Sequence, residues 1–118
     1  MLRDASGFTH IYIACGYTDL RRGIDGLASI IKEQFGKDPF EIGSIYLFCG
    51  RRPDRIKALV YEGDGFVLLY KRLSNGRFQW PKNTSDATEI SYEQYKWLMD
   101  GFEVIRKQTI KDVYPKIF

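Results

Sequence analysis

Two apolar runs on either side of Gly63-Asp64-Gly65 form the most regular pattern in the chain. Residues 56–62 and 66–73 are rich in Val, Leu, Tyr and Phe, which is typical of β-strands. An Asp-Gly pair between apolar runs is a strong signal for a β-hairpin, because these residues tolerate the positive φ of a tight turn. The pattern therefore predicts a hairpin, with its turn centred on Asp64-Gly65 or one residue earlier, on Gly63-Asp64.

The choice between these turns shifts the strand pairing by two residues and leaves the faces unchanged, because side chains alternate across a strand. One face carries Ile56, Ala58, Val60, Val67, Leu69 and Leu73, with Lys71 among them. The other face carries Leu59, Tyr61, Phe66, Leu68 and Tyr70, followed by Arg55, Lys57 and Arg72. Both faces are apolar near the turn, so we expect a central hairpin that is covered on both sides there and basic at its open end.

Apolar residues upstream of the hairpin predict two strands and a helix. Residues 9–15 (THIYIAC) and 42–48 (IGSIYLF) have strand composition. Between them, an amphipathic helix is indicated by apolar residues spaced four, three, four and four apart: Leu20, Ile24, Leu27, Ile31 and Phe35. Thr18 is the expected N-cap of this helix, and Gly36 its end.

The pattern downstream of the hairpin is less regular. Residues 77–80 predict a short strand that Pro81 ends, and the polar residues 82–90 predict a loop. Ser91 and Gln94 have the spacing of a capping box, so a second helix is expected from there to Gly101. We therefore predict a single α+β domain over residues 1–118, with a core at about 9–102 and a tail at 103–118. Its mostly antiparallel sheet has four to five strands, a central hairpin and two helices.

Charge is distributed unevenly along the chain, although the formal net charge is only +3. Residues 1–80 carry 12 basic and 9 acidic side chains, whereas residues 81–118 carry 6 of each. Cys15 and Cys49 lie in or beside apolar runs without metal-ligand spacing, which favours free thiols over a disulfide. No apolar run is long enough to span a membrane and no signal peptide opens the chain, so we expect a cytoplasmic protein.

Acidic residues raise the question of a metal-dependent nuclease, since a Mg²⁺ site needs converging carboxylates. Asp64 is explained by its turn, Asp19 and Asp25 by helix-end and ion-pair roles, and Asp54 by the neighbouring arginines. His10 is the only histidine, and it has no further ligand at metal spacing. We therefore expect no enzyme, no catalytic residue, no metal site, no cofactor and no small-molecule substrate.

Basic residues interleaved with aromatic residues form the candidate site, because strand pairing gathers them at the open end of the hairpin. Such a cluster can bind phosphates while its aromatic rings stack on bases, and it can also serve only to keep an edge soluble. The candidate nucleic-acid-binding residues here are Arg51, Arg52, Arg55, Lys57, Tyr70, Lys71, Arg72, Arg77 and Trp80.

Arg21 and Arg22 extend this candidate set. In the first turn of the predicted helix they would form an anion site with its free N–H groups. The alternative, which we favour, is that Asp19 neutralises Arg22 and Asp25 pairs with Arg21.

The sequence also resembles a known family. Residues 17–31 (YTDLRRGIDGLASII) and 51–81 (RRPDRIKALVYEGDGFVLLYKRLSNGRFQWP), in this order, are similar to the small accessory protein of IS-66-type bacterial insertion sequences. That protein is the second open reading frame product, or TnpB, of the group, and is distinct from the RNA-guided nuclease of the same name. The similarity covers roughly residues 9–100.

The resemblance implies a bacterial accessory factor for transposition, working beside a separate transposase that cuts and joins DNA. It supplies no catalytic residues. Family members often have tryptophans before the turn, where this chain has Val60 and Tyr61. The leading hypothesis is a non-catalytic factor that contacts DNA at the element ends. The second is an adaptor that docks on the transposase, and the third is a nuclease.

Overall fold

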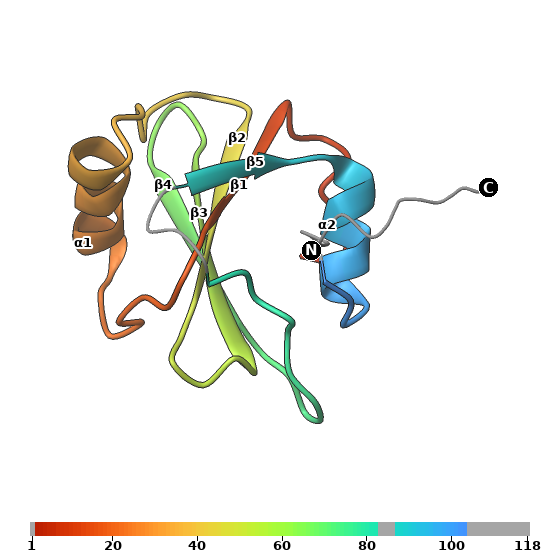
Figure 1. Cartoon of the computed structure of the whole chain (residues 1–118). Helices are drawn as coiled ribbons and strands as arrows, with labels where there is room; N and C mark the ends of the chain where they lie inside the picture. The colour runs from red at the N-terminus through yellow and green to blue at the C-terminus, as the bar shows by residue number, and fades with distance from the viewer. Residues whose placement is uncertain (1, 83–86, 104–118) are drawn as a thin grey trace.

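The computed structural model describes residues 2–82 and 87–103 of the 118-residue chain. Its elements are β1 (His10–Ala14), α1 (Ile24–Ser29), a π-helical turn η1 (Ile30–Gln34), β2 (Ser44–Cys49), β3 (Arg55–Tyr61), β4 (Phe66–Arg72), β5 (Ala87–Ile90) and α2 (Tyr92–Met99). The strands form one sheet in the order β4-β3-β2-β1-β5, with α1 and α2 on opposite sides of it (Figure 1). The predicted α+β class and mostly antiparallel sheet are confirmed. Most of the predicted tail, residues 104–118, lies outside the described residues.

Among the described strands, β1 and β2 are the only parallel neighbours, and the other pairs are antiparallel. A parallel pair needs a crossover connection, which α1 and η1 provide. Consequently β1 and β2 finish at the same end of the sheet, where β3 begins and β4 finishes. This end is the lower one in Figure 1, and we call it the basic end.

The sheet has an apolar core on each face. The core beneath α2 includes Ile13, Leu47 and Ile56 from the sheet and Tyr95 and Leu98 from α2. The core beneath α1 and η1 is made by Tyr12, Tyr46, Phe48, Leu59, Leu27, Ile30 and Ile31. Residues that alternate along one strand enter different cores, so both faces of the inner strands are buried.

The hairpin has the second of the two predicted registers. Tyr61 pairs with Phe66, and the turn centres on Gly63-Asp64. Gly63 has a φ of +100°, in the left-handed region that favours glycine. The predicted faces are confirmed, since Leu59 and Leu68 belong to one core and Ala58 and Leu69 to the other. No residue of β4 is fully buried, so the expected cover on both sides near the turn is only partial. β3 is an inner strand but β4 is an edge strand, so the expectation of a central hairpin holds for only one of its strands.

The first helix begins later than the sequence predicted. α1 starts at Ile24 with Gly23 as its N-cap in an extended conformation, and Thr18 instead donates its backbone N–H to Cys49 O at 2.8 Å. Gly23 disfavours a helix running through it from Thr18, which explains the later start. The predicted end is confirmed, since Gly36 has a φ of +64°.

The prediction of a strand at residues 77–80 was wrong, and so was that of a loop throughout 82–90. Phe78 and Trp80 are buried but lie outside any strand, whereas residues 87–90 form β5 and pair with β1. β5 can be polar because it is an edge strand, whose outer edge is exposed to water. The second helix is confirmed, with a complete capping box between Ser91 and Gln94.

Candidate nucleic-acid interface

A depression with a volume of about 930 Å³ lies at the basic end of the sheet. Its walls come from the segment after β1, the β2–β3 loop, the start of β3 and the α1 face of β4. Five cationic side chains line it, namely Arg21, Arg51, Arg52, Arg55 and Lys57. We call this feature the basic depression. Tyr17 and Tyr70 line it as well, and both are exposed.

Backbone hydrogen bonds hold the loops around the basic depression. Thr18, in the segment after β1, donates to Cys49 O at the end of β2. Phe78 donates its N–H to Pro53 O in the β2–β3 loop at 2.7 Å. Phe78 is itself buried, so this bond ties the loop to the core. The arginines of the loop are therefore carried by an anchored backbone.

Two ion pairs neutralise part of the positive charge here. Arg21 Nη2 lies 2.8 Å from Asp19 Oδ2, and this guanidinium lowers the pKa of Asp19 to about 2. Arg55 Nε lies 2.9 Å from Asp54 Oδ1, and that hydrogen bond lowers the pKa of Asp54. Both carboxylates therefore remain charged at neutral pH.

Arg51 and Arg52 are the two arginines of the basic depression that form no ion pair with a described residue. Both side chains are exposed. Lys57 Nζ donates to the carbonyl of Arg22 at 3.0 Å, which ties β3 to the segment before α1. Two guanidinium groups facing solvent beside exposed tyrosines can bind phosphate groups and stack on planar rings.

Arg21 and Arg22 are not in the first turn of a helix, because α1 begins at Ile24. The predicted helix N-terminal anion site is therefore wrong. The alternative of neutralisation by a carboxylate was correct in kind but assigned the wrong partner, since Asp19 pairs with Arg21 and not with Arg22. Arg21 lines the basic depression, whereas Arg22 lies beside it.

The remaining predicted basic residues do not line the basic depression. Arg72 pairs with Arg55 in the register of β3 and β4 and is exposed, as is Arg77. Lys71 is half-buried and belongs to the opposite face of the hairpin, because β4 side chains alternate. The structure therefore gathers Arg21, Arg51, Arg52, Arg55, Lys57 and Tyr70 of the candidate set in one place.

Trp80 does not belong to this surface. Only 4% of it is exposed, and its indole Nε1 donates to Ala14 O at 2.8 Å. A buried ring whose N–H is already bonded is not accessible for stacking on a base, so the prediction of Trp80 as a binding residue was wrong. Its apolar area and single donor explain this position, because buried tryptophans bond their N–H internally.

Tyr17 is a residue of the depression that the sequence pattern missed. It is 42% exposed, and Lys82 Nζ lies 5.7 Å from the centre of its ring. The candidate set that the pattern predicts does not include Tyr17. The signal that points to it is an aromatic residue outside every apolar run, next to Gly16.

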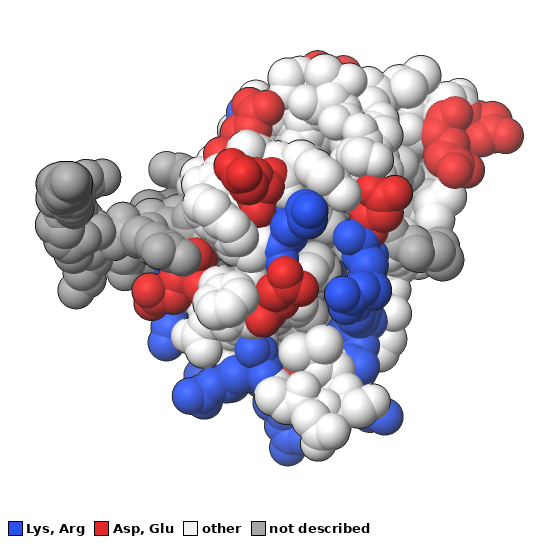
Figure 2. Space-filling view, turned by 90° about the vertical axis from the view of Figure 1, so that its right-hand side faces the viewer, with Lys and Arg blue, Asp and Glu red and all other residues white. Residues whose placement is uncertain are grey.

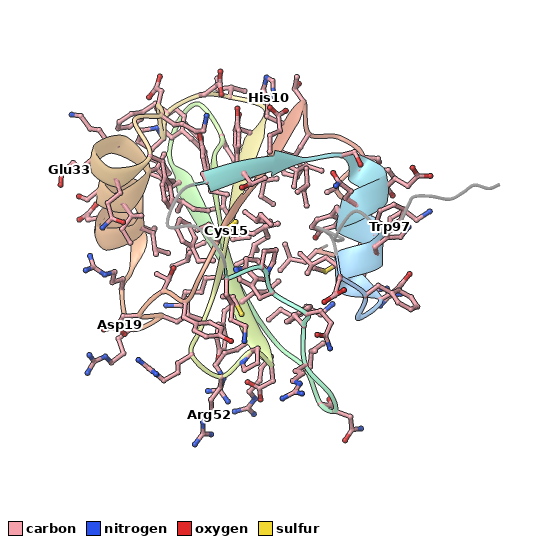
Figure 3. The ribbon with its side chains drawn as sticks, viewed as in Figure 1. His10, Cys15, Asp19, Glu33, Arg52 and Trp97 are labelled. Atoms are coloured by element: carbon pink, nitrogen blue, oxygen red, sulfur yellow. The ribbon has the colours of Figure 1, made fainter. Side chains whose placement is uncertain are left out.

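Charge is separated along the sheet. Figure 3 shows Arg52 and Asp19 near one end and His10 at the other. His10 pairs there with Glu89 at 2.7 Å, and that hydrogen bond raises the pKa of the histidine. Figure 2 shows Lys and Arg gathered mainly toward the lower end of one face, with most Asp and Glu above them.

The structure offers no support for a metal-dependent mechanism in the part it describes. No group of three or more His, Cys, Asp or Glu side chains converges among residues 2–82 and 87–103. Cys15 and Cys49 are free and buried, as predicted. Within the same residues, no helix has the length and apolar character needed to cross a membrane.

Comparison with known proteins identifies the family. The chain is 36% identical over 93 residues to the uncharacterized protein y4hO of Sinorhizobium fredii, covering 79% of this chain and 80% of that protein. It is 31% identical over 96 residues to y4jC of the same organism, covering 81% of each. No solved structure matches. The family described as IS66 Orf2 like protein matches residues 9–109, which extends the resemblance beyond residue 100. The chain therefore belongs to the IS66 Orf2-like family of insertion-sequence-associated proteins.

Proposed function

We propose that this protein is a non-catalytic accessory factor for transposition that binds DNA through the basic depression. The observation that carries the proposal is the convergence of five cationic side chains and two exposed tyrosines in one depression. The family supplies the setting of an insertion sequence. Cutting and joining of the strands then belong to the transposase of the same element.

The number of cations sets the expected salt dependence. Each neutralised phosphate contributes about −0.9 to the slope of log K against log salt on duplex DNA. Arg21 and Arg55 already have carboxylate partners, which leaves Arg51, Arg52 and Lys57 as the main contacts. Three contacts predict a slope of about −2.7, or roughly a 40-fold loss of affinity between 50 and 200 mM salt.

The test compares two double variants that each remove two positive charges. Arg51→Ala/Arg52→Ala removes the unpaired guanidinium groups, whereas Lys32→Ala/Lys96→Ala removes exposed lysines of η1 and α2. Binding to element-end duplex DNA is measured by fluorescence anisotropy at several salt concentrations. We expect the arginine variant to flatten the slope by about 2 and the lysine variant to leave it nearly unchanged. Equal effects of the two variants, or no binding by the wild type at low salt, would contradict the proposal.

The second candidate is an adaptor that docks on the transposase without touching DNA. Exposed apolar side chains at the opposite end of the sheet favour it, since Phe40 is 55% and Ile42 is 69% exposed. A pull-down with the transposase separates the two functions. Complex formation that survives alanine at Arg51, Arg52, Arg55 and Arg72 together, while DNA binding is absent even in the wild type, would favour the adaptor.

A further inference from the structure

The outer edge of β4 is unusually open for an edge strand. β4 has seven residues, contains no proline and pairs with β3 in an unbroken register from end to end. Proteins commonly blunt such edges with charged side chains (lysine above all), prolines, bulges or very short strands. The opposite edge follows that practice, since β5 has only four residues and carries the exposed Glu89. β4 carries charge only at its last two residues, Lys71 and Arg72, so residues 66–70 stand out as a template for another strand.

The hydrogen-bonding groups of β4 that face outward can be assigned. Glu62 N donates to Gly65 O at 2.8 Å, which makes these residues a hydrogen-bonded pair of the hairpin. Hydrogen-bonded and non-bonded pairs alternate in an antiparallel ladder. Phe66, Leu68 and Tyr70 therefore direct their backbone N–H and C=O groups away from β3. No bond to these groups occurs among the residues that the structure describes.

Side chains along this edge differ sharply between its ends. Near the turn, Phe66 packs against the exposed ring of Phe40 with 5.2 Å between ring centroids, and Asp64 is exposed beside them. At the other end Tyr70 is 53% exposed and is followed by the exposed Arg72. An apolar and acidic end and an aromatic and basic end thus lie on the same strand.

We propose that β4 pairs antiparallel with β4 of a second copy of this chain, about a two-fold axis, to form a continuous ten-stranded sheet. Antiparallel pairing brings the basic end of one strand level with the acidic turn of the other. A register centred on Leu68 sets Phe66 opposite the partner's Tyr70 and Arg72 level with the partner's Asp64. This complementarity of the edge to itself selects a second copy as the occupant, because a two-fold interface uses the same surface twice. The inference does not depend on DNA binding.

The first test blocks the backbone of the edge. Proline at position 70 removes an N–H that does not bond to β3, so the ladder inside the sheet is kept. Tyr70→Thr is the matched control, because it also removes the ring but retains the N–H, and its β-branched side chain favours a strand. We expect light scattering to give twice the mass of one chain for the wild type at high concentration. Tyr70→Pro should dimerise at least tenfold more weakly than Tyr70→Thr, with both variants folded by far-UV circular dichroism.

The second test uses charge and holds even if the proline variant fails to fold. Asp64→Lys and Arg72→Asp should each weaken the dimer at low salt, and the two together should restore it to within about twofold of the wild type. A double variant weaker than either single variant would overturn the proposal. A wild type that stays monomeric up to near-millimolar concentration would also overturn it, and would leave the edge to a strand of another protein.

Discussion

Trp80 is the residue for which the sequence and the structure disagree most about function, and two substitutions separate the alternatives. Trp80→Ala removes the indole, and Trp80→Phe keeps an aromatic ring but loses the N–H that bonds to Ala14 O. If Trp80 belongs to the core, both variants lose stability and a folded Trp80→Phe keeps its affinity for DNA. If Trp80 stacks on bases, the affinity changes and the stability does not.

The size of the effect follows from the burial of the ring. A tryptophan buries about 200 Å² of apolar surface, which at about 25 cal/mol per Å² corresponds to about 5 kcal/mol. Because only 4% of Trp80 is exposed, nearly all of this is lost in Trp80→Ala, and we expect a cost of about 4 kcal/mol. Trp80→Phe should cost about 1–3 kcal/mol, since it leaves a buried carbonyl without its donor.

Equilibrium unfolding in urea, followed by circular dichroism, measures both costs. With a slope of about 2 kcal/mol per M, a loss of 4 kcal/mol moves the midpoint by about 2 M. Circular dichroism is preferable to fluorescence, because both substitutions remove one of the two tryptophans and leave only Trp97 as a fluorescent indole. A midpoint shift below about 0.5 M for Trp80→Ala would refute the reasoning. So would a loss of DNA affinity in a Trp80→Phe variant of normal stability.

Three further substitutions test other parts of the structure. Tyr46 has a buried hydroxyl without a hydrogen-bond partner in the part of the chain that is described, so Tyr46→Phe should leave the free energy of unfolding unchanged or raise it by about 1 kcal/mol; a clear loss would contradict this. Ser91→Ala breaks the capping box of α2 and should cost about 0.5–2 kcal/mol, whereas no measurable loss would mean that the cap is not formed in solution. The Asp19 carboxyl should titrate by NMR at about 2, below its ordinary 3.8, so its stabilising effect is complete above pH 4 and is lost as the pH falls through 2. Arg21→Ala should move that midpoint back toward 3.8, and an unchanged midpoint would exclude the ion pair as its cause.

The hairpin could be predicted from the sequence because its information is local. Alternation assigns residues to faces whichever turn is chosen, and the structure confirms those faces. The capping box of α2 is equally local. The start of α1 was predicted too early, because the apolar stripe continues through Leu20 while the backbone before Gly23 is not helical. The position of β5 depends on pairing with β1, a contact that no short pattern of residues 87–90 reveals.

The candidate site was predictable to the extent that strand pairing determines it. Arg55 and Lys57 are brought beside Tyr70 by the ladder of the hairpin. Arg21 joins them through the crossover from β1, which the apolar pattern indicated only in outline. Burial decides whether an aromatic residue among arginines belongs to the surface or to the core. That property arises from the whole fold, which is why the pattern selected Trp80 and missed Tyr17.

The separation of charge along the sheet also affects how the molecule is oriented as it diffuses toward a charged partner. Uncompensated arginines lie at one end, and the exposed carboxylates of Glu41, Glu62 and Asp64 lie around the hairpin turn at the other. This distribution of charge gives the protein an electric dipole directed along its strands. In the field of a polyanion it experiences a torque that turns the arginines forward, so that more random encounters arrive in one orientation. This alignment weakens once the Debye length falls below about 10 Å, near 0.1 M salt, while contacts already formed at close range are screened less.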